Sequence, residues 1–430
     1  MLVFQFHFAI GATVRNVSCN GNITTLLQAA IDSSADGDTV NIGAGSCTGA
    51  TVNWENKNIE VHGQGMTQTT VSGLSFEVKN SEKSSFRISG LAVGAPSTWK
   101  INADNRTTGI KGWRIDNIKW SYPTCTQNIA VSIQGITWGV IDHNNFSNAG
   151  NAIFIVAYAE NTVEVNPFPS TGMPGMGGYS WSLPLNLGSD EAVYIEDNNF
   201  SMDKGCYYGV GDSFYGGRSV FRHNSVTNAY WQNHAARSAE RGGNLKAEIY
   251  GNDFNATDAA WSRAIHVRSG TGVIFNNSLR GFFNTIEGDN QRSNGQNTGT
   301  PFGSCDGSSK WDGNKENGWP CLDQVGRGPG GQYFNLPFNT SQPSVPLQSW
   351  NNGSVIGCSN GGTCDNKYSI ISDGDSHVST KAHNNGEVDI LNTPEPKVGY
   401  TPFVYPHPLV SGQVALQPSL VAPKNFRWIK

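Results

Sequence analysis

Apolar and polar positions recur along the chain in a short pattern: an apolar residue, two variable residues, a polar residue, one variable residue and a second apolar residue. Copies of this pattern begin 27, 28, 54, 26, 28 and 25 residues apart. They start at Phe86, Trp113, Ile141, Ile195, Phe221, Ile249 and Ile274. Short apolar runs at a period near 27 residues, with no helical pattern between them, predict a parallel β-helix in which each coil consists of a few short strands.

The polar position of the pattern is an asparagine in five successive copies. These residues are Asn144, Asn198, Asn224, Asn252 and Asn277. Because coils of a β-helix stack about 4.8 Å apart, equivalent side chains form columns along the solenoid. We therefore expect the five asparagines to hydrogen-bond to one another as a ladder, which makes them structural rather than functional.

The interval of 54 residues between Ile141 and Ile195 is twice the usual spacing. It holds either two coils or one coil with an insertion. The segment from Pro167 to Pro184 is dense in Gly and Pro, which is typical of an excursion loop. We therefore expect one coil that carries an insertion.

Near the N-terminus, residues 24–32 have the pattern of an amphipathic helix, and a strand-like run ends at Ile42. This combination resembles the capping helix and first strand of the right-handed β-helix proteins of the pectate-lyase-like superfamily, over about residues 20–290. The resemblance implies an all-β fold, a single-stranded right-handed parallel β-helix. One face of the helix is expected to consist of Leu26, Leu27, Ala30 and Ile31.

The chain divides into three predicted regions. An N-terminal strand and capping helix occupy residues 1–45, the β-helix 46–290, and an irregular disulfide-containing extension packed on the solenoid 291–430. The stretch from Pro394 to Leu409 has too many prolines for a central strand, so we expect it to pack along the solenoid. Residues 1–12 fit either an export-signal remnant or an ordinary first strand.

Composition and charge exclude several classes of protein. Hydrophobic residues make up 37% of the chain and aromatic residues 10%, which is enough apolar area to offset the entropy cost of ordering. Charged residues are only 15%, too few for a coiled coil. A net charge of -5 argues against a general nucleic-acid-binding protein. No run approaches the roughly 18 apolar residues that a membrane-spanning helix requires.

The eight cysteines show no CxxC pair and no histidine spacing typical of zinc, so disulfides are favoured over a metal site. Candidate pairs are Cys19 with Cys47, Cys305 with Cys321, and Cys358 with Cys364, although sequence does not fix the connectivity. Disulfides would indicate an exported protein, either secreted or at the cell surface.

A strand column with outward-facing side chains is the expected ligand-binding face. Its strands are predicted at 131–134, 153–156, 206–210, 234–237 and 265–268, and the last two each carry a His and an Arg. Basic residues also gather in this part of the sequence: Arg218, Arg222, Arg237, Arg241, Lys246, Arg263 and Arg268. The guanidinium fork suits carboxylate or sulfate, so an acidic polysaccharide fits this zone. The alternative is that these side chains are solvated and paired with nearby acids.

Residues 237–254 and 264–279 resemble the two catalytic coils of the chondroitinase B and alginate lyase family. Arg268 matches the family arginine, and residues 141–146 resemble an upstream Ile-Asp-His segment of that family. The family's proposed base is a lysine, and Arg237 occupies that position here, although arginine is rarely deprotonated. The resemblance implies a polysaccharide lyase. No convincing set of calcium-binding acids is present, so the metal is unknown and a Ca²⁺ requirement stays open.

A lyase that acts on uronate polymers must neutralise the carboxylate, remove the C5 proton and expel the C4 oxygen. Arginine can neutralise the carboxylate, His is suited to act as the base, and tyrosine can act as acid or base. The candidate catalytic residues are Arg268, Arg237, His234, His266 and Tyr208. Candidate substrate-binding residues are Arg218, Arg241, Lys246, Arg263, Trp231 and Trp261. Each histidine alone is more often structural.

Two other functions remain open at this point. A glycoside hydrolase needs two carboxylates about 5 to 9.5 Å apart, and although Asp190, Glu191, Asp212 and Glu240 are available, nothing in the sequence singles out a pair. A non-catalytic adhesin, tail spike or fibre subunit would also use stacked coils and exposed aromatic residues to bind glycans. The sequence does not decide between a monomer and a self-assembling fibre.

Overall fold

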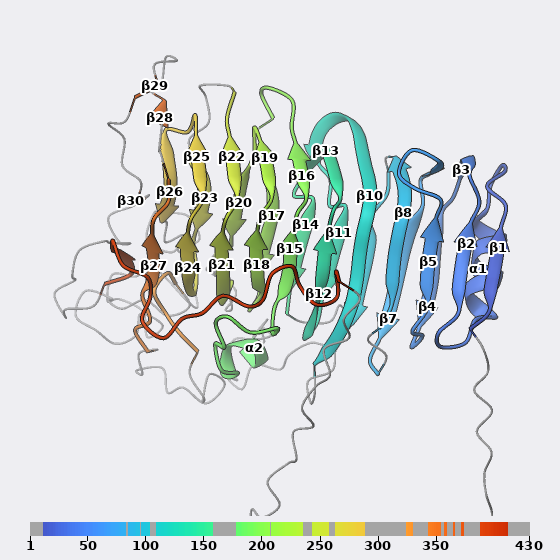
Figure 1. The fold of residues 1–430 in the computed structure, drawn as a ribbon, viewed down its shortest axis with the longest axis horizontal. Helices are drawn as coiled ribbons and strands as arrows, with labels where there is room; N and C mark the ends of the chain where they lie inside the picture. Colours follow the sequence, from blue (N-terminus) through green and yellow to red (C-terminus); the bar gives the residue numbers. More distant parts are fainter. Residues whose placement is uncertain are drawn as a thin grey trace, which may run out of the picture.

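The computed structural model shows a solenoid of short parallel strands (Figure 1). This confirms the predicted parallel β-helix. The structure describes residues 12–82, 85–94, 96–103, 109–157, 178–206, 208–234, 243–257, 263–288, 324–329, 343–353, 357–358, 364–365, 371–373 and 388–411. The side chains of 126–127, 178, 357–358, 364–365 and 371–373 lie outside this description.

Two of the three strand columns belong to one sheet, here called sheet A. Its first column consists of β1 (Val14–Val17), β2 (Thr39–Ile42), β5 (Glu60–Gly63), β8 (Arg87–Gly94), β10 (Ile110–Gln127), β12 (Thr137–Asp142), β15 (Val193–Glu196), β18 (Arg218–Arg222), β21 (Lys246–Tyr250), β24 (Thr271–Phe275), β27 (Leu347–Trp350) and β31 (Ile390–Asn392). Its second column contains β3 (Gly45–Thr48), β6 (Thr69–Ser72), β13 (Asn145–Gly150), β16 (Asn199–Ser201), β19 (Ser225–Thr227), β22 (Asp253–Asn255) and β25 (Ser278–Arg280).

The third column forms a separate sheet, here called sheet B, which closes each coil. It consists of β4 (Thr51–Glu55), β7 (Ser75–Asn80), β9 (Trp99–Ala103), β11 (Val131–Gln134), β14 (Ile153–Val156), β17 (Gly209–Phe214), β20 (Tyr230–Asn233), β23 (Arg263–Val267), β26 (Asn284–Gly288) and β30 (Ile371–Asp373). A short antiparallel pair, β28 (Gly357–Cys358) and β29 (Cys364–Asp365), lies apart from both sheets. From the predicted N-terminal region, β1 and β2 join sheet A. From the predicted C-terminal extension, β27 and β31 join sheet A and β30 joins sheet B.

The register of sheet A confirms the period for most copies of the pattern. Ile195 pairs with Phe221, and Phe221 with Ile249, so that one apolar column fills the interior. In β10, however, Ile115 rather than Trp113 pairs with Ile141. The first two copies are therefore displaced by two residues from the alignment that the sequence suggests. After a one-residue register shift between Lys111 and Trp113, the paired residues of β10 and β12 are 26 positions apart along the chain, instead of the 28 that the pattern suggests.

The predicted asparagine ladder is present. Each side-chain amide of Asn144, Asn198, Asn224 and Asn252 donates to the amide oxygen of the next asparagine at 2.9 to 3.0 Å. Asn277 continues the ladder by donating to Asn352 at 2.9 Å, a rung that the sequence pattern did not identify.

Helix α1 (Thr24–Asp32) has the predicted bounds and packs over the first coil. Leu27 and Ile31 are buried, as expected, but Leu26 is 58% exposed and does not belong to the buried face. The Cys19–Cys47 disulfide closes this end of the chain, as predicted. A second disulfide joins Cys125 to Cys206, a pair that the sequence did not suggest. Cys305 and Cys321 lie outside the described residues.

The long interval in the sequence is one coil with an insertion, as predicted, because β12 pairs directly with β15 and β14 with β17. The described part of the insertion contains the short helix α2 (Gly178–Ser182). Its carbonyl groups lie against the outer face of sheet A, where they contact Arg218.

The C-terminal segment, residues 395–411, runs along the outer face of sheet A from β27 back to β10 (Figure 1). Tyr400 packs on Phe275 and Trp350, and Phe403 on Tyr194. The predicted packing of this proline-rich stretch along the solenoid is confirmed. Among the described residues, no helix has the length and apolar character needed to cross a membrane.

Candidate functional site

Polar side chains line the outer face of sheet B across four successive strands. Asp212, Gln232, His266 and Glu287 occupy equivalent positions of β17, β20, β23 and β26 and form one outward column. Three of the strands differ from their predicted bounds. The strand expected at 265–268 is Arg263–Val267, so Arg268 lies just beyond its end. The strand expected at 206–210 is Gly209–Phe214, and the one expected at 234–237 is Tyr230–Asn233.

His234 and Arg268 lie on neighbouring coils in a second outward column. Asn233 pairs with Val267, so the next residues, His234 and Arg268, face the same side one strand apart. Arg268 donates from Nη2 to Oε1 of Gln232 at 2.9 Å. Both side chains are buried, with residue exposures of 8% for His234 and 7% for Arg268. The position one coil before Arg268 thus belongs to His234, whereas Arg237 lies outside the described residues.

His266 lies among charged side chains. Nη1 of Arg263 is 3.1 Å from Nε2 of His266 and also donates to Glu287. Burial lowers the pKa of His266 well below its usual value, and the positive charges of Arg268 and Arg263 act in the same direction. Because arginine can only donate, its contact with the ring requires an unprotonated ring nitrogen. Burial and the neighbouring arginines therefore both favour the neutral form of His266.

A tyrosine that sequence reasoning missed completes this cluster. Tyr230 begins β20, and the guanidinium carbon of Arg263 is 5.9 Å from the centre of its ring. Burial raises the pKa of Tyr230, while Arg263 and Arg268 oppose the shift. Tyr208, the tyrosine chosen from the sequence, is half-buried beside β17, and both tyrosines also pack against the core, but only Tyr230 is described in contact with Arg263. The alternation of inward Trp231 and outward Gln232 is the signal that could have placed Tyr230 on the outer face.

Two basic residues expected to bind substrate lie on sheet A instead. Arg218 is buried and donates to the carbonyl oxygens of Ser180 (2.8 Å) and Pro184 (2.7 Å) in the insertion. Lys246 is buried beside Glu248 at 3.1 Å and donates to the carbonyl oxygen of Asn186. Burial lowers the pKa of Arg218 to about 10 and also lowers that of Lys246. These contacts anchor the insertion, and neither residue joins the cluster on sheet B.

None of the tryptophans that the structure describes is exposed as a platform for sugars. Trp231 is fully buried, stacks on Phe221 at 4.6 Å and donates to Asn233 at 3.0 Å. Gly211 on the neighbouring strand leaves room for the indole ring. Trp113, Trp120, Trp138 and Trp181 are buried as well. Arg241 and Trp261 lie outside the described residues.

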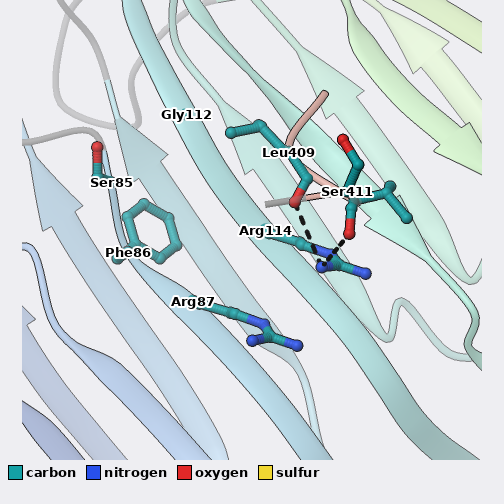
Figure 2. A pocket seen from close by; sticks show the side chains of 8 residues that line it. Ser85, Phe86, Arg87, Gly112, Arg114, Leu409 and Ser411 are labelled. Atoms are coloured by element: carbon teal, nitrogen blue, oxygen red, sulfur yellow. Dashed lines mark hydrogen bonds between the residues drawn. The ribbon is translucent and has the colours of Figure 1, made fainter. Parts of the chain in front are cut away.

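A shallow cavity of about 500 Å³ opens on sheet A at the end of the C-terminal segment (Figure 2). Arg87 in its wall is held by Asp116 and Glu60, and Arg114 by Asp142 and by the carbonyl oxygens of Leu409 and Val410. The remaining lining residues are Ser85, Phe86, Gly112 and Ser411. The described lining of this cavity contains no histidine or tyrosine that could act as base or acid, so it is a weaker candidate than the cluster on sheet B.

Metal binding has no candidate site among the residues that the structure describes. No group of three or more His, Cys, Asp or Glu side chains comes together there in a way that could hold an ion. The question of a Ca²⁺ requirement is therefore one for experiment.

No protein-family model matches the sequence, and no curated protein matches it. Among solved structures, an alginate lyase from Paenibacillus sp. str. FPU-7 aligns over 66% of this chain and 83% of its own, with 15% identity and a TM-score of 0.26. The PL6 family alginate lyase AlyGC aligns over 94% of this chain and 59% of its own, with 12% identity and a TM-score of 0.34. The catalytic domain of a GH87 alpha-1,3-glucanase aligns over 87% of this chain and 70% of its own, with 10% identity and a TM-score of 0.32. Because these TM-scores lie below 0.5, we take the fold from the strand pairings and the site from the side chains of this chain.

Proposed function

We propose that this protein is a polysaccharide lyase that cleaves a uronate-containing polysaccharide by β-elimination on the outer face of sheet B. The observation that carries the proposal is the contact of Arg263 with the buried His266, with Tyr230 beside Arg263 and Arg268 bonded to Gln232 on the same outer face. A uronate carboxylate needs positive charge, its C5 proton needs a base, and the departing C4 oxygen needs an acid. The cluster offers one group for each of these needs.

In the proposed reaction, the substrate carboxylate lies between Arg263 and Arg268, which stabilise the charge that develops on it as the C5 proton leaves. The imidazole of His266 accepts that proton. The electron pair of the C5–H bond forms the C4=C5 double bond while the C4–O bond breaks. Tyr230, whose raised pKa keeps it protonated at neutral pH, donates its proton to the departing oxygen.

Substrate binding would also strengthen the base. The two positive charges that lower the pKa of His266 belong to the arginines that would hold the carboxylate. A bound anion offsets these charges, so the pKa of His266 rises when substrate is present. His234, one coil away from Arg268, is the second candidate for the base.

The spacing of the acids that the structure describes beside the cluster does not favour hydrolysis, while Glu240 lies outside the described residues. Asp212 and Glu287 lie in one outward column but three strands apart, which corresponds to about 14 Å. Carboxylates that act together in glycoside hydrolysis are about 5 to 9.5 Å apart. Histidine and arginine lie between the two acids, a set that suits elimination better.

An extracellular location forms part of the proposal. The Cys19–Cys47 and Cys125–Cys206 disulfides support it, because such bonds form and persist in oxidising compartments. The proposed partner is an acidic polysaccharide, which would meet the described face of sheet B along the axis of the solenoid.

The proposal is tested by incubating the protein with alginate, pectate, chondroitin and hyaluronan, with and without Ca²⁺, while ultraviolet absorbance follows new C4=C5 double bonds. We expect one polymer to give a steady rise, and Arg268→Ala to reduce its rate at least a hundredfold. Arg280→Ala is the matched control, because Arg280 pairs with Asp253 on sheet A at 2.7 Å, away from the site. A flat trace with every polymer would reject the lyase and leave a binding role.

The same assay identifies the base. His266→Gln is expected to abolish turnover, whereas His234→Gln should mainly weaken substrate binding. The reverse result would assign the proton transfer to His234. His62→Gln is the control on sheet A, where His62 bonds to Ser89 at 3.0 Å.

A further inference from the structure

One aromatic side chain interrupts the polar outward column of sheet B. From β7 to β26, the residues of this column pair in register one after another. They are Glu77, Lys100, Ser132, Phe154, Asp212, Gln232, His266 and Glu287. Phe154 is the single apolar member of this described set, and it is half-buried rather than enclosed.

Phe154 is fixed in place by neighbours on the same outer face. Its ring centre lies 6.0 Å from that of Phe214 in a tilted arrangement, and Val156 and Tyr215 belong to the same small apolar cluster. His234 also packs on this cluster, with its ring centre 4.2 Å from that of Phe214. The aromatic patch is therefore continuous with the polar cluster that holds Arg268.

The strand spacing relates Phe154 to the proposed reaction centre. β14 is two strands from β20 and three from β23, so Phe154 lies about 10 Å from the level of His234 and about 14 Å from that of His266. A hexose in a 1,4-linked chain advances by a length close to the strand spacing of about 4.8 Å. A polysaccharide that follows the column thus presents about one sugar to each coil.

We propose that Phe154 is an aromatic platform that stacks on a sugar ring two to three units from the cleaved bond. This inference rests on the proposed function, and it deepens that function by assigning a remote subsite that sets a preference for long chains. A sugar ring has an apolar face of C–H groups that packs on a flat aromatic ring, and Phe154 is the half-buried aromatic residue of this column.

The test compares three-unit and six-unit oligosaccharides of alginate and of pectate. In Phe154→Ala, kcat/KM for the six-unit substrate is expected to fall about tenfold, whereas the value for the three-unit substrate stays within twofold, because the shorter chain does not span the column. Phe154→Leu keeps apolar volume but no flat ring, so it should show the same length-dependent loss. Phe154→Trp should retain the activity of the unmodified protein.

Two results would overturn the platform. One is an equal loss for both chain lengths, and the other is full activity in Phe154→Leu, since either result means that Phe154 only packs against Phe214. If no oligosaccharide is cleaved by the unmodified protein, the proposed lyase is wrong, and calorimetric binding of the same oligosaccharides then tests the platform separately. The same dependence on chain length is expected in the dissociation constants, and its absence would reject the platform.

Discussion

Arg263 places one guanidinium nitrogen against both Glu287 and the ring of His266. The guanidinium group is thereby held where it keeps the imidazole unprotonated. Substitution of Arg263 by Met removes one of the positive charges that lower the pKa of His266, so this pKa should rise. The acid limb of the kcat profile should therefore move to higher pH. A limb that stays in place would show that His266 is not the group that titrates.

Glu287→Gln provides the complementary test, because it keeps the shape of the side chain and removes its charge. Arg263 then loses its carboxylate partner and acts on His266 without compensation. We expect the acid limb to move in the opposite direction, to lower pH. If the acid limb of the kcat profile moved in the same direction in both variants, His266 would not be the group that titrates.

The C-terminal segment depends on buried charges on sheet A. Arg222 bonds to Glu196 at 2.6 Å and to the carbonyl oxygens of Phe403 and Val404. Arg222→Met leaves Glu196 buried without its partner, which should reduce the free energy of unfolding by about 3 to 5 kcal/mol. Urea denaturation measures this loss. The double variant Arg222→Met with Glu196→Leu should recover part of the lost free energy of unfolding. If the losses of the two single variants simply added in the double variant, Arg222 and Glu196 would not be energetically coupled.

Acid should destabilise the protein through His407. Burial next to Arg222 and Arg114 lowers the pKa of His407 from 6.5 to about 3. Between these values the unfolded chain binds a proton that the folded chain does not, so stability falls as the pH drops through this window. The loss reaches on the order of 4 kcal/mol at its lower end. In His407→Gln, the pH dependence measured by urea denaturation should be flatter.

His143 is the matched control of opposite sign. Its hydrogen bond to Asp142 raises the pKa of His143, so protonation stabilises the folded state. His143→Gln should therefore make the loss of stability in acid larger rather than smaller. If the free energy of unfolding depended on pH equally steeply in His407→Gln and His143→Gln, this account of acid stability would be wrong.

Substitution of an asparagine in the middle of the ladder should reduce the stability of the protein more than substitution at its end. Asn224 accepts bonds from Asn198 and donates to Asn252 and to two carbonyl oxygens. Asn224→Leu should cost about 3 to 5 kcal/mol, because several buried groups lose their partners. Asn352 also accepts from Asn277 and donates to Ile274 and Ser349, but it is only half-buried, so water can replace lost partners and Asn352→Leu should cost about 1 to 2 kcal/mol. Thermal unfolding of the two variants compares these values, and equal losses would argue against a continuous ladder.

The sequence predicted the parts of the fold that every coil repeats. Asn198 and Asn224 occupy equivalent turns, so their spacing alone reveals the column. Asn352 was missed because 75 residues separate it from Asn277. The displacement at Trp113 was missed as well, since Trp113 and Ile115 are both apolar and either one can be taken as the start of the pattern.

The site was only partly predictable for a related reason. The sequence selected His266, which lies on β23 between two inward residues, and Arg268, which directly follows the end of that strand. It also grouped Arg218 with them, because proximity along the chain does not show which sheet a residue joins. The carbonyl groups that enclose Arg218 come from an insertion more than thirty residues away, and no local signal marks that contact.

The central claim is that the outer face of sheet B carries out elimination and not hydrolysis. The most direct test is mass analysis of products formed from a cleaved polyuronate in heavy-oxygen water, with Arg268→Ala and Arg280→Ala in parallel. We predict unsaturated products without solvent oxygen, formed by the unmodified protein and by Arg280→Ala but not by Arg268→Ala. Saturated products that contain solvent oxygen, or unsaturated products formed equally well by Arg268→Ala, would contradict the account.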